Sequence, residues 1–433
     1  MSPASSSAPS SPAVAEAAWD ELRGIVGAQY LRAATAADAV CGVQPRWVAE
    51  PADGTQLAAA LRWANEAGIA VAPRGGGTKL GWGNAPTRLD LILSTARLDH
   101  IVEHVWSDMT VVVQAGVPVG RLQQALAQHS QRIATDPLWP ERATIGGILS
   151  TNDSGTLRLR FGALRDLILG VTLALPDGTL AKSGGKVVKN VAGYDLPKLA
   201  TGALGTLGII TQAAFRLHPA PPAGSGRSLT FAPANADDAA RILLAVQDSQ
   251  LAHTGLQARL AHDGPPRVDL RFEGTAAGTD AQSATARKLA APAAEADSPA
   301  GAWDARQQLW ESAESAAMIK FSVLPSRIAA TCDAFRREGE KAGMRWRIVV
   351  QGTGLGWARL EAARPDALRS AILAARAAVE HEMGSLVVMQ RPPGLESLEA
   401  WGSPGDAFPV MVRVKQQFDP RGTLNPGRFV GGI

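Results

Sequence analysis

The stretch PRGGGTKLGWG, residues 73–83, holds five glycines and directly follows the apolar run 68–72. Glycine reaches positive φ and permits close approach, so this pattern predicts either a tight turn or a row of N–H groups that cradles a phosphate. The strand in front of the loop, together with Arg74 and Lys79 inside it, argues against a flexible linker. These residues alone leave the turn and the phosphate cradle both open.

Length and composition narrow the class of protein. The 433 residues are enough for two or three domains, and 46% hydrophobic with 19% charged residues is typical of a soluble globular chain. The largest basic cluster, Arg158, Arg160 and Arg165, has no interleaved aromatic residues, which argues against nucleic-acid binding. No run of about 18 apolar residues occurs and the N-terminus lacks a signal-peptide pattern, so we expect a cytoplasmic protein.

Two cysteines, Cys41 and Cys332, are too few to ligate an iron–sulfur cluster. Redox chemistry in this chain would therefore need an organic cofactor.

The order of elements predicts an α+β fold. Strands and helices alternate over 45–130, residues 142–220 are rich in glycine, and the Pro/Gly stretch 219–224 is typical of a domain boundary. Beyond it, strands alternate with alanine-rich helices at 236–250, 280–292, 326–342 and 366–383, which predicts a sheet covered on one face. We expect a disordered tail (1–22), a first domain (23–220), a second α+β domain (221–395) and a C-terminal segment (396–433) that packs back on the first domain.

Three further glycine-rich places lie at 144–147, 183–186 and 202–208. The last contains GxxGxxG rather than GxGxxG, and GxxxxGK[ST] does not occur, so neither a Rossmann nor a P-loop site is indicated. Each place alone is more often a turn. Together they fit a pyrophosphate cofactor better than a small substrate.

Several of these stretches resemble motifs of a known protein family. Residues 45–219 resemble the FAD-binding domain of the vanillyl-alcohol oxidase (PCMH) type, through PRGGGT at 73–78, DPLWPERATIGGILSTNDSG at 136–155 and GTLGIIT at 205–211. The ending DPRGTLNPG at 419–427 is similar to that of the D-lactate and glycolate dehydrogenase branch. The run GGKVVKNVAGYDL at 184–196 resembles the FAD-binding accessory subunit of bacterial glycolate oxidase, also called glycolate dehydrogenase. The second domain would then be the cap domain of this fold.

The resemblance implies FAD as cofactor. Gly75, Gly76, Gly77 and Thr78 would surround its pyrophosphate, and Ile210 would offer main-chain groups to the adenine end. The other residues implied as FAD contacts are Arg74, Gly81, Pro137, Thr144, Gly147, Thr151, Asn152 and Gly155. Relatives that bind flavin covalently often carry histidine where this chain has Thr78, so we expect noncovalent FAD. Leu204 stands where the family often has glutamate.

The sequence lacks an obvious catalytic base. Catalytic relatives carry histidines in a second-domain strand that corresponds to GTGLGWARL at 352–360, and this stretch has none. Of the histidines beyond residue 220, His253 and His262 lie in loop-like sequence and His381 ends a predicted helix, so we expect no metal site. Tyr194 is a weak substitute base. Lys320 and Arg391 are candidates to hold a carboxylate, with ordinary surface roles an equal alternative.

These features predict an FAD-binding subunit of a glycolate oxidase or dehydrogenase complex that oxidises glycolate to glyoxylate. The chain would lack its own base, be inactive in isolation, and serve as an electron relay or structural flavin subunit. Its partners would be a sister FAD-linked subunit and an iron–sulfur subunit, with inner-membrane contact only through the complex. The alternative is a self-sufficient FAD-dependent dehydrogenase of glycolate or D-lactate. A structural subunit without flavin is disfavoured by the intact glycine loop.

Overall fold

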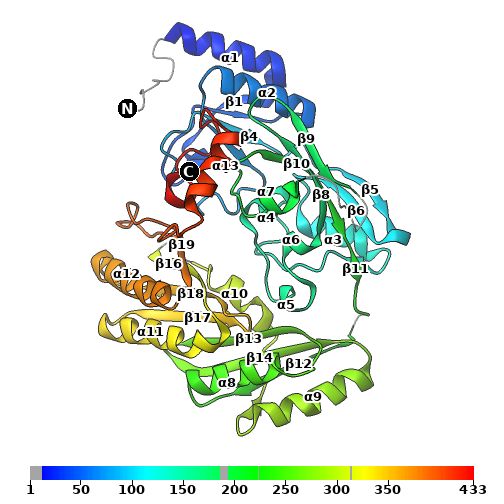
Figure 1. Ribbon diagram of the computed structural model, residues 1–433, viewed down its shortest axis with the longest axis vertical. Helices are drawn as coiled ribbons and strands as arrows, with labels where there is room; N and C mark the ends of the chain where they lie inside the picture. Colours follow the sequence, from blue (N-terminus) through cyan, green and yellow to red (C-terminus); the bar gives the residue numbers. More distant parts are fainter. Residues whose placement is uncertain (1–11, 186–193, 223, 313–314) are drawn as a thin grey trace.

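The computed structural model describes residues 12–185, 194–222, 224–312 and 315–433. It has the predicted α+β architecture: two smaller sheets with their helices form one part, and an eight-stranded sheet with four long helices lies below it in Figure 1. None of the helices in the described residues combines the length and apolar character that a membrane crossing requires.

The first sheet positions the glycine-rich loop. Its strands, in spatial order, are β1 (Leu31–Ala33), β2 (Trp47–Ala49), β4 (Leu91–Ser94) and β3 (Val71–Arg74), and the last three are parallel. Helix α2 (Gly54–Glu66) packs on it through an apolar face that includes Leu57 and Leu61. The Asp53 carboxylate caps this helix by accepting the Gln56 N–H, as DGTQ predicts.

The predicted tail is too long. Helix α1 spans Pro12–Val26, so the segment expected to be disordered through residue 22 is helical from Pro12 onward; residues 1–11 lie outside the described residues. The physical reason is burial, since Leu22 and Val26 are fully covered and join the core under α2.

A five-stranded antiparallel sheet completes the upper part. Its order is β5 (Ile101–Val105), β6 (Thr110–Gln114), β10 (Ile209–Arg216), β8 (Ile168–Ala174) and β9 (Leu180–Gly184). Its helices are α3 (Val119–Ala127), α4 (Ile145–Thr151), α5 (Arg158–Phe161), α6 (Leu164–Leu167) and α7 (Leu196–Ala200). A two-stranded pair, β7 (Gln131–Arg132) with β11 (His218–Pro219), leads toward the lower part.

The lower part is an eight-stranded antiparallel sheet. Its order is β15 (Ala294–Ala296), β12 (Gly226–Ala232), β14 (Gly264–Glu273), β13 (His253–Ala261), β17 (Arg345–Gln351), β18 (Leu355–Glu361), β16 (Ala317–Ser322) and β19 (Ser385–Gln390). The four helices are α8 (Ala236–Gln247), α9 (Ala276–Ala290), α11 (Ile328–Lys341) and α12 (Pro365–His381), close to their predicted ranges. This sheet corresponds to the expected cap domain, whose boundaries at 221 and 395 stay predictions.

Strand alternation gives the sheet two different faces. Ile348 and Val350 point to the helices, whereas Val349 between them packs with Trp82 and Leu138 of the upper part. In β16, Ile319 and Phe321 join the helix-side core in the same way. Lys320 therefore faces the upper part.

One prediction for this sheet is wrong. Residues 253–262 were expected to be loop-like, but β13 (His253–Ala261) is a central strand that pairs with β14 and β17. Leu256, Ala258 and Leu260 supply a buried alternating face despite the polar residues between them.

The C-terminal segment packs back on the upper part, as predicted. The Val71 N–H donates to Thr423 O and the Asn425 N–H to Val71 O, so the segment runs beside β3. Helix α13 (Phe408–Phe418) lies next to it (Figure 1). Lys415 on this helix is hydrogen-bonded to Asp419 at 2.6 Å and to Thr206 O at 2.9 Å, which fixes the segment to the 204–208 turn.

Candidate functional site

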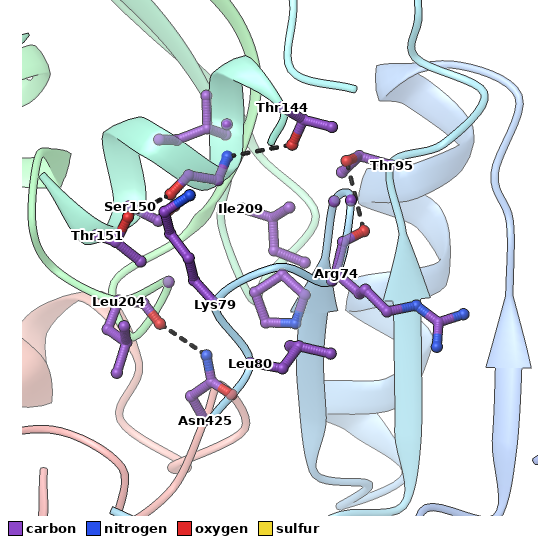
Figure 2. A pocket seen from close by; sticks show the side chains of 18 of the residues that line it. Arg74, Lys79, Leu80, Thr95, Thr144, Ser150, Thr151, Leu204, Ile209 and Asn425 are labelled. Carbon is purple, nitrogen blue, oxygen red and sulfur yellow. Dashed lines mark hydrogen bonds between the residues drawn. The ribbon is translucent and has the colours of Figure 1, made fainter. Parts of the chain in front are cut away.

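The glycine-rich loop forms one wall of a pocket at the end of β3, here called the glycine-loop pocket (Figure 2). Thr95 and four separate segments build it: 73–80, 144–151, 204–210 and the C-terminal 425–428. Thr95 N–H donates to Arg74 O, and Asn425 Nδ2 donates to Leu204 O at 2.7 Å. Segments far apart in sequence therefore converge on one cavity.

The loop glycines have a packing reason as well as a chemical one. A Cβ at Gly75 would lie 2.1 Å from Thr144 Oγ1, and one at Gly76 would lie 1.8 Å from Arg142 O. Gly77 has φ +71°, which L side chains rarely adopt. The loop is thus pressed against segment 142–144 by backbone approach, while its other side lines the pocket.

Helix α4 provides the opposite wall. Thr144 caps it by accepting the Gly147 N–H at 3.4 Å, and Thr151 Oγ1 donates to Gly147 O at 2.8 Å (Figure 2). Gly205, at φ +70°, approaches Pro73 so closely that a Cβ would lie 2.7 Å from its ring. The α4 side of the cavity therefore presents small hydroxyl groups and glycine backbone, which suit phosphate and ribose oxygens.

Most of the predicted FAD contacts surround this one pocket. They are Arg74, Gly75, Gly76, Gly77, Thr78, Thr144, Gly147, Thr151 and Ile210. Four do not: Gly81 lies beyond it, Asn152 lines the adjoining pocket described below, and Pro137 and Gly155 line a separate cavity against the cap sheet. Direct contact of each residue with FAD stays a prediction.

Arg74 lines the glycine-loop pocket, but its guanidinium group points away from the cavity (Figure 2). Its Nη1 lies 2.6 Å from Asp38 Oδ1, and in Figure 2 the guanidinium points away from Ser150 and Thr151. The Arg32 guanidinium holds the pKa of the Asp38 carboxyl well below its usual range, and the Thr35 N–H and Arg74 assist. Arg74 therefore anchors the base of the loop.

Lys79 is buried at the other end of the loop. Its Nζ lies 3.2 Å from Asp153 Oδ2 and donates to Leu138 O, while Arg306 of α10 (Ala305–Gln308) pairs with Asp153 Oδ1 at 2.8 Å. Burial alone would raise the pKa of Asp153, but Arg306 and Lys79 outweigh it and keep the carboxyl ionised. Two cations and one carboxylate thus join the loop to the cap sheet.

A second cavity, between the two parts and here called the interdomain pocket, adjoins the glycine-loop pocket. The two share Thr151 and Leu204. The interdomain pocket is lined by Trp82, Gly83, Thr151, Asn152, Arg158, Gly202, Leu204, Lys320, Phe321, Ser322, Leu355, Ser385, Val387, Met389, Trp401 and Phe429. Its apolar walls and few polar groups are typical of a small-molecule site.

Three polar side chains in this pocket have no partner in the described part of the chain. Asn152 Oδ1 is buried without a hydrogen bond. Arg158 and Lys320 form neither a hydrogen bond nor an ion pair with any described side chain or backbone group. Unpaired cations beside a buried amide indicate that an anionic ligand belongs here.

Burial lowers the pKa of Lys320 to about 8. The nearby Asp153 carboxylate counteracts this effect, and the positive charges of Arg158 and Arg306 reinforce it. Carboxylate binding and a solvated surface role are thus no longer equal alternatives for Lys320, because the amine lies in a cavity.

The other candidates for chemistry lie elsewhere. Tyr194 is 91% exposed and lines neither pocket, and Arg391 donates to Gly83 O and Leu398 O. His381 is exposed at the end of α12, His253 bonds Gln247, and His262 contacts Trp346 O. Among the described residues, the interdomain pocket has no histidine in its wall.

Sequence reasoning missed several wall residues. Asn425 and Arg428 belong to the C-terminal turn NPGR, and Arg428 donates to Leu80 O and Trp82 O, which holds the loop in place. In the sequence, Arg158 stands out only as a member of the basic cluster with Arg160 and Arg165. The one available signal was alternation in MIKFSV, which puts Lys320 opposite the apolar Ile319 and Phe321.

Comparison with known proteins agrees with this geometry. Residues 45–184 match the family of FAD binding domains. D-lactate dehydrogenase of Archaeoglobus fulgidus is 38% identical over 173 residues, 40% of this chain, and glycolate oxidase subunit GlcD of Bacillus subtilis is 34% identical over 177 residues, 41% of this chain. Each match covers 38% of the relative's own length.

The fold extends over the whole chain. The structure of 4-ethylphenol oxidase from Gulosibacter chungangensis superposes with a TM-score of 0.74, covering 97% of this chain and 98% of that one at 17% identity. The vanillyl-alcohol oxidase-type fold and FAD as cofactor are therefore confirmed. The resemblance to FAD-linked chains of the glycolate oxidase type is confirmed as well.

Proposed function

We propose that this chain is an FAD-dependent oxidoreductase that acts on a 2-hydroxy acid as the flavin subunit of a glycolate oxidase-type complex. The observation that supports this proposal most is a pocket with a glycine-rich wall beside a second pocket that holds two unpaired cations. The first fits a pyrophosphate cofactor and the second fits a small carboxylic acid, so cofactor and substrate would meet where the two pockets share Thr151 and Leu204.

The glycine-loop pocket would hold FAD through Gly75–Thr78, Gly147 and Thr151. Bound FAD supplies the two-electron oxidant for the hydroxyl-bearing carbon. Thr78 cannot form a histidyl bond, so the cofactor would be held noncovalently. The chain's own contribution is to orient the acid and to exclude water from the interdomain pocket with Trp82, Trp401 and Phe429.

Arg158 and Lys320 are the groups suited to bind the acid. The substrate carboxylate would give Arg158 a partner that the described chain lacks, and Lys320 would contact another polar group of the acid. Glycolate and D-lactate are the expected substrates, in line with the names of the relatives.

Two versions of this function differ in where the proton goes. In the first, the chain is a relay or structural flavin subunit, a sister FAD-linked subunit oxidises glycolate, and an iron–sulfur subunit takes the electrons. The absence of histidine from the described wall of the interdomain pocket supports it. In the second, the chain is a self-sufficient dehydrogenase, and the buried amine of Lys320 supports that version.

Anaerobic mixing of the FAD-loaded chain with glycolate or D-lactate tests the proposal. Bleaching of the visible flavin band by the isolated chain supports self-sufficient chemistry. Bleaching only after the sister flavoprotein is added supports the relay. If neither acid bleaches the flavin under either condition, the proposed function is wrong. Purification of the native complex with flavin counted per chain would test the partners.

A further inference from the structure

The interdomain pocket contains one group that can exchange a proton near neutral pH. Among its lining side chains, only Arg158 and Lys320 carry an acidic or basic group. Arginine stays protonated in proteins, so it can hold an anion but cannot accept a proton. The amine of Lys320 is the remaining acceptor among the described wall residues.

The register of β16 directs Lys320 into the pocket. Lys320 shares a strand face with Met318, which packs in the apolar cluster between the cap sheet and the upper part. Its cross-strand neighbours are Trp357 of β18 and Val387 of β19. Both neighbours are uncharged. The charged groups that act on the amine come from the upper part and from α10, namely Asp153, Arg158 and Arg306.

Building on the proposed function, we infer that Lys320 is the proton acceptor for the bound 2-hydroxy acid and that Arg158 holds its carboxylate. The hydroxyl O–H bond breaks as a new N–H bond forms on the lysine amine. The C2–H bond also breaks, and its hydrogen leaves with both bonding electrons as a hydride. The acid is oxidised to a 2-oxo acid and bound FAD is the two-electron oxidant. Lys320 takes the role that the sequence leaves open for a histidine.

The electrostatics agree with this assignment. Burial and the two arginines bring the pKa of Lys320 to about 8, so a fraction of the amine is neutral near neutral pH and half of it near pH 8. A lysine used only as a carboxylate anchor would work best fully charged. Here the carboxylate charge of the substrate would be met by Arg158, which leaves the amine free for the hydroxyl.

Chemical rescue separates a proton acceptor from an anchor. In the FAD-loaded chain, we expect Lys320→Ala to slow single-turnover flavin reduction by glycolate about 10²- to 10⁴-fold, the usual contribution of a general base. Added methylamine should raise the flavin-reduction rate of Lys320→Ala at least about ten-fold, because it can occupy the vacated space and accept the proton. Lys320→Arg keeps the charge, leaves no space and should not be rescued.

Binding of oxalate, an unreactive dicarboxylate, gives a readout independent of turnover. Its dissociation constant, measured from the shift of the flavin spectrum, should change less than about five-fold in Lys320→Ala and rise at least about ten-fold in Arg158→Met. In the wild type, the reduction rate should rise with pH through about 8 and level off above it.

The inference is overturned if Lys320→Ala reduces flavin within about ten-fold of the wild-type rate, or if methylamine gives no rescue and oxalate binding is lost. The first result would leave the proposed function intact, with another acceptor. A wild-type chain that binds oxalate but never reduces its flavin would also overturn it and favour the relay. A wild-type chain that binds neither FAD nor oxalate would contradict the proposed function itself.

Discussion

Arg306 in the cap sheet's α10 donates to Asp153 in the upper part, with Nη1 2.8 Å from Oδ1, and both side chains are almost completely buried. The other carboxylate oxygen lies 3.2 Å from Lys79 in the glycine-rich loop. Arg306 also donates to Asp136 O and Ser154 O. One carboxylate thus links the loop to the cap sheet, and with it the two pockets.

Arg306→Leu should weaken this link strongly. Removing one partner leaves Asp153 buried with only Lys79, and breaking a buried pair costs about 3–5 kcal/mol. Urea denaturation should show the loss as a lower midpoint. Arg287→Leu is the matched control, because its pair with Glu295 is solvent-exposed and should leave the midpoint nearly unchanged. Equal midpoints for the two variants would contradict the structural role of Arg306.

Gly76→Ala should lose FAD. The added Cβ would lie 1.8 Å from Arg142 O, so the loop must leave its place beside segment 142–144 and the pocket wall opens. Gly24→Ala in α1 is the control, since nothing lies within 4 Å of its added Cβ and it does not line the pocket. The ratio of visible flavin to protein absorbance in the purified variants measures the effect. Full flavin content in Gly76→Ala would show that this loop does not hold the cofactor.

FAD should be released by acid. Thr78 occupies the position at which covalent relatives often carry histidine, and a threonine hydroxyl does not form the histidyl–flavin bond. After precipitation with trichloroacetic acid, the yellow colour should remain in the supernatant. A covalent flavoprotein treated in parallel should keep its colour in the pellet. Colour in the pellet of this protein would contradict noncovalent binding.

Asp38 should make stability fall at low pH. Its pKa in the folded state is far below the value of about 3.9 in an unfolded chain, so its contribution is complete above about pH 4 and is lost as pH falls further. Asp38→Asn should therefore be less stable than the wild type at pH 7, and the gap should narrow at pH 3. Asp20→Asn, at an exposed position, should leave stability nearly unchanged at both pH values. A constant gap for Asp38→Asn would contradict this account.

Lys415→Met should loosen the C-terminal segment. The ammonium group bonds Asp419, Thr206 O and Leu424 O, and its removal leaves the fully buried Asp419 carboxylate without its cation. We expect a destabilisation of about 3–5 kcal/mol and weaker FAD binding, because Asn425 and the 204–208 turn line the pocket. Lys341→Met, which removes an exposed pair with Glu338, is the control. Unchanged FAD affinity would show that the segment does not support the pocket.

Local chemistry made part of the site predictable. Glycines at 75–77, the Asp53 cap of α2 and the alternation in β16 and β17 depend on a few neighbouring residues, so each can be read in sequence. The start of α1 and strand β13 were misjudged. In both cases burial against residues distant in sequence, rather than local propensity, decides the structure.

The sequence by itself determined the α+β class, the FAD-binding motif and the absence of a histidine from segment 352–360. Only the tertiary structure decided that Arg74 pairs with Asp38, that Tyr194 is in solvent, and that Lys320 and Arg158 line one interdomain pocket. The physical reason is that the charge state and reach of a side chain depend on which distant groups surround it. Lys320 and Arg158 are separated by more than 160 positions, and their common cavity exists only once the eight-stranded sheet packs on the upper part.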